Sequence, residues 1–147
     1  MLAIRAATFA ELDPVTLYHL LQLRVAVFVV EQACPYPELD GRDLEPATLH
    51  LWVEGDERPA AYLRILRDAD GTARIGRVVT APDRRGMGLA AALVRHAIGL
   101  TAPSAVTLSA QSHLAGWYEQ FGFEVAGAEF MDDGIPHTPM RMVRPAC

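Results

Sequence analysis

The stretch GRVVTAPDRRGMGLAAALVRHA, residues 76–97, joins an extended apolar run to an alanine-rich helix through two arginines and two glycines. A helix N-terminus presents unpaired backbone N–H groups and about half a positive charge from the helix dipole. Gly86 and Gly88 leave that backbone bare, while Arg84 and Arg85 add charge and can bond a phosphate through two nitrogens. The stretch therefore predicts a strand, a pyrophosphate-binding turn and a helix in succession.

The glycine turn has two competing interpretations. A surface turn that binds nothing is the usual explanation of an isolated G-x-G. Gly86, Gly88 and Ala91 also fit the dinucleotide pattern G-x-G-x-x-A, which needs an acidic residue about 20 positions later to hold the ribose. The segment found there, LSAQSH, has no acidic residue, and this disfavours a dinucleotide-binding protein.

Three helices and one long loop are predicted. Pro14, preceded by Asp13 as N-cap, starts a helix that runs to about residue 30. Three prolines and a glycine after Glu31 predict an ordered loop over residues 31–48. A second helix is expected over residues 86–100, and a short third helix ends at Gly122. The apolar faces predicted from helical spacing are Leu17, Leu21, Val25 and Phe28 in the first helix, and Leu89, Leu93, Ala97 and Leu100 in the second.

Seven segments have the composition of strands. They are residues 2–6, at an edge, residues 48–54, 59–66 and 73–80 as a meander, residues 105–110, and residues 123–130 and 138–143 near the C-terminus. Their order is neither a repeat nor a regular strand–helix alternation. We therefore expect the α/β (α+β) class, with a mixed central sheet of six to seven strands and helices on both faces.

Length and charge limit the number of domains and the kind of partner. A chain of 147 residues suffices for one buried core, which predicts a single domain over residues 1–147. The net charge of -5 disfavours nucleic acid and anionic membranes as partners. There is no uninterrupted apolar run of about 18 residues, and the N-terminus does not fit a secretory leader. The chain is therefore expected to be cytoplasmic.

The counts of several residue types limit the chemistry further. Cys34 and Cys147 form no paired framework, and the five histidines lack the close spacing of zinc ligands, so neither a disulfide nor a metal is predicted. The sequence has no lysine and no asparagine, which excludes a P-loop lysine and a Schiff-base lysine.

Arg85, Gly88 and Ala90 fit the pattern R-x-x-G-x-A, and with it the chain resembles the GNAT (Gcn5-related) N-acetyltransferases. Four segments narrow the resemblance to the ElaA-like subgroup: residues 20–43, residues 76–90, YEQFGF and DGIPHTPM. These motifs occur in the right order and extend the resemblance over about residues 15–142. The resemblance implies the GNAT fold, with acetyl-CoA as the co-substrate.

The resemblance also implies where acetyl-CoA binds. Its pyrophosphate would lie on residues 85–90, and its pantetheine arm would pair with the preceding strand as a short extra strand would. Gln111 stands where many GNAT enzymes have an asparagine bonded to the pantetheine. With Arg84 from the turn, the implied cofactor-binding residues are Val78, Val79, Thr80, Arg84, Arg85, Gly86, Met87, Gly88, Leu89, Ala90 and Gln111.

Acetyl transfer to an amine needs a neutral nucleophile, a donor for the oxyanion and a proton for the leaving thiolate. By the resemblance, Tyr118 would supply that proton, at a cost of roughly 2 kcal/mol in water because a phenol is a weaker acid than a thiol. Its alternative role is packing in the core. Glu31 is a candidate general base or a surface glutamate, and His50 and His137 are candidate bases or substrate contacts, or structural histidines.

These inferences predict an acetyl-CoA-dependent N-acetyltransferase in which an amine attacks the thioester directly. The acceptor would be a small amine or a peptide or protein, and we leave a homodimer open. The alternatives are an acyl-CoA-binding regulatory protein without activity and, less favoured, a dinucleotide-binding oxidoreductase. Asp40, Asp43 and Glu45 are predicted to form a solvated loop face, with recognition of a cationic acceptor as the less favoured role.

Overall fold

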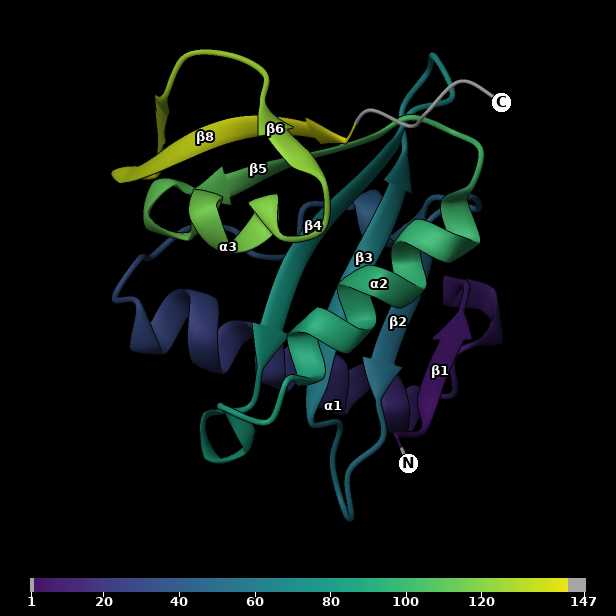
Figure 1. Ribbon diagram of the computed structural model, residues 1–147. Coiled ribbons are helices and arrows are strands. Elements are labelled where there is room, and N and C mark those ends of the chain that lie inside the picture. Colours follow the sequence, from purple (N-terminus) through teal and green to yellow (C-terminus); the bar gives the residue numbers. More distant parts are fainter. Residues whose placement is uncertain (1, 143–147) are drawn as a thin grey trace.

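Eight strands form one mixed sheet in the computed structural model, which describes residues 2–142 (Figure 1). The strands lie in the order β1-β2-β3-β4-β5-β8-β6, and β7 also pairs with β8. Neighbouring strands are antiparallel, except that β4 and β5 are parallel. Their bounds are Ile4–Ala7 for β1, Leu49–Val53 for β2, Ala61–Arg67 for β3, Ala73–Thr80 for β4, Val106–Gln111 for β5, Phe123–Val125 for β6, Phe130–Asp132 for β7 and Ile135–Met142 for β8.

The mixed sheet confirms the predicted class, but the described residues form one strand more than the six to seven expected. The difference arises at residues 123–130, which were predicted to be a single strand. The small residues 126–128 have low strand propensity and separate β6 from β7. The two short strands pair with opposite ends of β8, Phe123 with Met142 and Phe130 with His137.

Helices cover both faces of the sheet, with α2 on one face and α1 on the other (Figure 1). The first helix, α1 (Pro14–Arg24), continues into a π-helical segment (Val25–Glu31), and Asp13 caps it by accepting a hydrogen bond from the Thr16 amide at 2.9 Å. The other two are α2 (Leu89–Thr101) and α3 (Ala115–Glu119). The second helix starts later than the predicted residue 86, because Gly88 has a positive φ of 74° that no α-helix accommodates.

The buried face of α1 differs from the predicted one. Leu20, Arg24 and Val27 are buried, whereas the predicted residues Leu17, Leu21, Val25 and Phe28 are only half-buried. The apolar pattern missed this face because its central residue is an arginine. In α2 the prediction is confirmed for Leu89, Leu93 and Ala97, while Leu100 is exposed.

By length and composition, residues Pro14–Glu31 would be long and apolar enough to cross a membrane. In this structure Leu20 and Val27 pack against Trp52 and Tyr62 of the sheet, and Arg24 is 1% exposed. The segment therefore packs on the sheet along one face.

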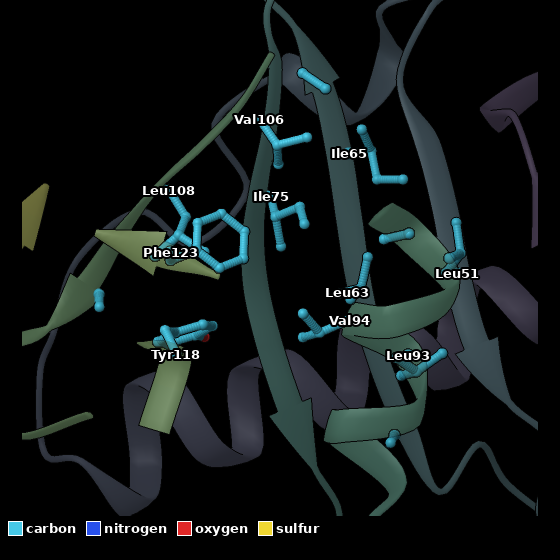
Figure 2. Packing of buried hydrophobic residues seen from close by; sticks show 14 of the residues in the cluster. Leu51, Leu63, Ile65, Ile75, Leu93, Val94, Val106, Leu108, Tyr118 and Phe123 are labelled. Atoms are coloured by element: carbon cyan, nitrogen blue, oxygen red, sulfur yellow. The ribbon is translucent and has the colours of Figure 1, made fainter. Parts of the chain in front are cut away.

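The two faces of the sheet have different cores. On the α2 face, the core is apolar and includes Leu63, Ile65 and Ile75 from the sheet with Leu93 and Val94 from the helix (Figure 2). On the α1 face, a smaller apolar cluster lies beside buried charges. The long loop over residues 32–48 supplies three carboxylates to those charges.

We call these charged residues the loop network: Glu38, Asp40 and Asp43 of the loop, with Arg24, Arg64 and Arg77 of α1 and the sheet. Arg24 lies 2.8 Å from both Glu38 and Asp43, and Arg77 lies 2.7 Å from Glu38. The predicted solvated loop face is therefore wrong for Asp43, which is buried. Asp40 is exposed as predicted, although its carboxylate also bonds Arg64 at 2.9 Å. Glu45 stays at the surface with Arg42.

Strands β4 and β5 separate along their length, as Figure 1 shows. They pair only from Ala73 to Ile75 on the β4 side. Further along β4, the register against β3 shifts between Tyr62 and Arg64, so that Arg77 and Val78 form a β-bulge. Arg77 adopts a positive φ of 54° there. The bulge frees part of the β4 backbone from pairing and opens the sheet toward α3.

Candidate active site

Two cavities lie where β4 and β5 separate. The turn cavity, of about 510 Å³, extends from this gap to the glycine turn before α2. The loop cavity, of about 210 Å³, lies beside residues 32–36 of the long loop. The two cavities share six lining residues, and so they meet there: Phe28, Gln32, Val78, Gln111, Leu114 and Tyr118.

Most of the predicted cofactor-binding residues line the turn cavity, namely Val78, Val79, Thr80, Arg85, Gly86, Ala90 and Gln111. The other four lie around it. Leu89 is buried in the apolar core, and Met87 is exposed. Arg84 lines a different cavity beside α1, and Gly88 forms the N-cap of α2. The structure thus brings seven of these eleven residues to one cavity and turns Arg84 away from it.

The backbone conformation of the turn before α2 requires its two glycines. Gly86 and Gly88 have φ values of 81° and 74°, a region that L side chains rarely adopt. A Cβ atom at either position would meet no atom within 4 Å, so the space above the turn is open. No side chain caps the N-terminus of α2. Its first amides are therefore available to an anion.

Arg85 forms an ion pair with Glu31, the predicted base. Both Nη atoms of the guanidinium donate to the carboxylate, Nη1 to Oε2 at 2.7 Å and Nη2 to Oε1 at 2.5 Å. These hydrogen bonds lower the pKa of Glu31, so its carboxylate is a weaker base than an ordinary glutamate. Glu31 lines neither cavity. Glu31 therefore pairs with Arg85, the residue predicted to bind the pyrophosphate, and it does not line the junction of the two cavities.

Tyr118 lies at the junction of the two cavities and is buried. Its ring packs edge-on against Trp117, with centroids 4.8 Å apart, and faces the core beside Phe123 (Figure 2). Burial raises the pKa of the Tyr118 phenol, which therefore keeps its proton at neutral pH. Gln111, across the same junction, donates a hydrogen bond to Gln32 at 3.2 Å.

The two candidate histidines have different surroundings. His50 is buried in the sheet, where its Nε2 donates to the Asp43 carbonyl at 3.2 Å and its Nδ1 accepts from the Tyr62 hydroxyl at 2.7 Å. Burial lowers the pKa of His50, and the residue lines neither cavity. His137 lines the loop cavity and sits opposite Gln111 in the β5–β8 register.

The tautomer of His137 follows from its hydrogen bond. Its Nδ1 lies 2.8 Å from the carbonyl oxygen of Ile135, which can only accept, so Nδ1 carries the hydrogen. The neutral ring then has its lone pair on Nε2. Stacking on Phe130, with centroids 5.8 Å apart, fixes the plane of the ring. His137 can thus accept a proton at the loop cavity.

Charged residues that sequence reasoning did not select also line the loop cavity. Arg64, Arg74 and Arg77 form one wall, which we call the arginine wall, while Asp132 ends β7 and Asp133 lies in the turn between β7 and β8. The segments YLRIL and ARIGR of β3 and β4 did contain a signal for these residues. Their arginines interrupt apolar strands at positions that face a covered side of the sheet. Such a charge needs a partner, and the partner is distant in sequence.

The thiol of Cys34 is buried and donates a weak hydrogen bond to the Asp133 carbonyl at 3.3 Å. This contact joins the long loop to the β7–β8 turn. The predicted absence of a Cys34–Cys147 disulfide is not tested, because Cys147 lies outside the described residues. Within residues 2–142, no group of three or more His, Cys, Asp or Glu side chains is placed to hold a metal ion.

A family model described as "Acetyltransferase (GNAT) domain" matches residues 18–144. A UPF0039 protein of Mycobacterium tuberculosis is 46% identical over 142 residues, which cover 94% of this chain and 91% of the relative. Among solved structures, an acyl-CoA N-acyltransferase from Pseudomonas aeruginosa superposes with a TM-score of 0.91 at 42% identity, and Escherichia coli ElaA does so with 0.91 at 36%. Each alignment covers 97% of this chain and 100% of the other.

Proposed function

Since this chain belongs to the GNAT acetyltransferase family, we propose that it transfers an acetyl group from acetyl-CoA directly to an amine acceptor. The observation that carries the proposal is the junction of the turn cavity and the loop cavity at Tyr118 and Gln111. Two substrates entering from opposite sides would meet at this junction. The similar acyl-CoA N-acyltransferase of Pseudomonas aeruginosa supports the same class of reaction.

The turn cavity fits the chemical groups of acetyl-CoA. The uncapped amides at the start of α2 and the Arg85 guanidinium suit a pyrophosphate. The free backbone of the β4 bulge near Val78 can pair with the amides of a pantetheine arm. Acetyl-CoA supplies the thioester, and the residues at the junction position it against the acceptor.

Tyr118 is proposed as the acid that protonates the leaving thiolate. Its burial raises its own pKa, and it also removes water that would stabilise the thiolate. A thiolate without water takes a proton more readily, which offsets the weak acidity of the phenol. Tyr118 therefore needs the dry junction in order to act.

His137 is proposed as the base in place of Glu31. The carboxylate of Glu31 is tied to Arg85 and lines neither cavity, whereas His137 lines the loop cavity with a free lone pair on Nε2. The α-amino group at a peptide N-terminus, with a typical pKa near 7.8, costs about 1 kcal/mol to neutralise at pH 7, against about 4.6 for a lysine-like amine.

The proposal is tested by thiol release from acetyl-CoA in the presence of a panel of amines, with acetyl-CoA binding measured separately by calorimetry. Release that depends on an amine is the expected result. Tight binding of acetyl-CoA without release for any amine would instead support the acyl-CoA-binding regulatory alternative. Binding of NADH or NADPH in preference to acetyl-CoA would support the oxidoreductase.

A further inference from the structure

We propose that the loop cavity binds an acceptor that carries a carboxylate beside its amine, which makes the acceptor a small amino acid or a close relative. This inference rests on the proposed function, because it names the substrate that meets acetyl-CoA at the junction. Three features of the loop cavity carry it: an unpaired donor on the arginine wall, two unpaired carboxylates opposite, and a small volume.

The arginine wall has hydrogen-bonding capacity to spare. Arg64 is 3% exposed, and its Nε–H has no hydrogen-bond partner, although both of its Nη atoms bond Asp40 or Asp43. Arg77 uses Nε and Nη2 for Glu38, and its Nη1 makes no hydrogen bond to any residue between 2 and 142. A buried donor without a partner is rare in folded proteins and points to a missing acceptor atom.

The counter-charges of these arginines do not line the cavity. Glu38, Asp40 and Asp43 pair with Arg64 and Arg77 but are absent from the cavity walls. Asp68 likewise pairs with Arg74, which lines the cavity, without lining it itself. The cavity thus meets guanidinium groups on this side. A carboxylate matches them, because it accepts two hydrogen bonds from a guanidinium fork.

The end of β7 and the β7–β8 turn supply the opposite charge. Asp132 and Asp133 line the cavity and form no ion pair with any described residue. The bond from Cys34 to the Asp133 carbonyl holds this turn beside the long loop. An ammonium group suits the carboxylates, and His137 of β8, which lines the same cavity, can take its proton. The amine end of the acceptor is therefore assigned to this side.

The cavity has room for a small acceptor, with a volume of about 210 Å³. The head of an amino acid fits this space. A diamine or another polycation would face three arginines and leave the Arg64 Nε–H unpaired, so the arginine wall disfavours both.

Matched acceptors test the inference. Leucine, leucinamide and isopentylamine share a side chain and differ in the group beside the amine, and kcat/KM for each is measured by thiol release. We expect leucine to exceed the other two at least tenfold. Calorimetry of the same three compounds with the CoA-saturated protein gives a second readout that needs no turnover, and leucine should bind at least tenfold more tightly.

Two variants test whether the carboxylate of the acceptor binds at the arginine wall. Arg74→Gln removes a guanidinium from a half-exposed position and should raise KM for leucine at least tenfold, with kcat and the Kd of acetyl-CoA unchanged. Arg67→Gln is the matched control, since Arg67 lies on β3 outside both cavities and should leave every constant unchanged. For isopentylamine neither variant should have an effect.

The outcomes separate the inference from the proposed function. Equal kcat/KM and equal binding for the three compounds would overturn the assignment of the acceptor while leaving the acetyltransferase intact. Selective binding of leucine without thiol release for any amine would overturn the acetyltransferase and keep the loop cavity as a carboxylate site. Equal loss in Arg74→Gln and Arg67→Gln would overturn the role of Arg74.

Discussion

The turn cavity and the loop cavity are built by the chain in different ways. One continuous segment, residues 76–90, supplies most of the predicted part of the turn cavity, through backbone amides, glycines and small apolar side chains. The loop cavity collects charged side chains from β3, β4, β7 and the β7–β8 turn, beside uncharged side chains of the long loop. The turn cavity, proposed for the cofactor, is therefore built from residues close together in sequence. The loop cavity, proposed for the acceptor, is built from residues that only the fold brings together.

The largest effect is expected at the loop cavity, for His137→Gln. A general base contributes roughly 100- to 10,000-fold, so kcat should fall by about 1,000-fold. A general base acts only in its unprotonated form, so the wild-type kcat/KM should rise with pH, and His137→Gln should lose this rise.

Glu31→Gln is the matched comparison for His137→Gln, because it removes the other candidate base. It should keep the rise of kcat/KM with pH, since Glu31 lines neither cavity. If the rise disappears in Glu31→Gln and persists in His137→Gln, then Glu31 is the general base. The assignment of the base to the loop cavity would then be wrong.

The next largest effect is expected at the junction that both cavities share. Tyr118→Phe keeps the ring and removes the proton, so kcat should fall by roughly 100-fold while the affinity for acetyl-CoA stays the same. Steady-state kinetics and calorimetry measure the two quantities. Tyr18→Phe serves as the control, because Tyr18 is exposed on α1. Little change in the kcat of Tyr118→Phe would assign the residue to packing alone.

A smaller effect is expected in the turn cavity, for Gly88→Asp. The variant places a negative charge beside the proposed pyrophosphate site and should weaken acetyl-CoA binding at least tenfold, or about 1.4 kcal/mol. Gly88→Asn is the control, since asparagine has a similar size, carries no charge and tolerates a positive φ. Calorimetry that finds the same Kd for both variants would remove the electrostatic explanation.

The smallest effect concerns the loop network beneath the loop cavity. The Arg64 guanidinium holds the pKa of Asp40 well below its usual range. For Asp43, burial raises the pKa, but hydrogen bonds and charges from Arg24 and Arg64 outweigh it, and the pKa is lowered. Both carboxylates therefore bind protons more readily in the unfolded chain than in the folded one.

The sign of the pH effect follows from these lowered values. The stabilisation is complete well above the unfolded pKa of about 3.9 and is lost as the pH falls through that value toward the folded pKa. Asp40→Asn should lower the free energy of unfolding by about 1 kcal/mol at pH 7 and by less at pH 3. Urea unfolding at both pH values measures this. A constant difference between them would mean that the Asp40 charge does not stabilise the loop.

The predictable parts of the fold are those with local signals. The strands of the meander, α2 and the glycine turn follow from spacing and from glycine, and the structure contains all of them. The face of α1 could not be derived in this way, since Arg24 is buried by partners in a loop that follows it. A pattern of apolar residues cannot indicate a buried charge.

The same limit applies to the candidate site. The R-x-x-G-x-A motif pointed to the turn cavity, which Arg85 and Ala90 line, because its residues lie close together in sequence. Arg64 and Asp133 come to one cavity only through β3 and the β7–β8 turn, and no spacing relates them. The contact between Glu31 and Arg85 is equally non-local, and because of it His137 is the proposed general base in place of Glu31.

Arg85, which lines the turn cavity, is already paired with the Glu31 carboxylate outside it. If the pyrophosphate binds at Arg85 as proposed, it replaces a carboxylate that already holds the guanidinium, so binding is an exchange of anions. Part of the entropy of ordering this long side chain is then lost before the ligand arrives, as in any preorganised site. The affinity reports a difference between two ion pairs, and it should vary less with salt concentration than the affinity of an unpaired arginine for a phosphate.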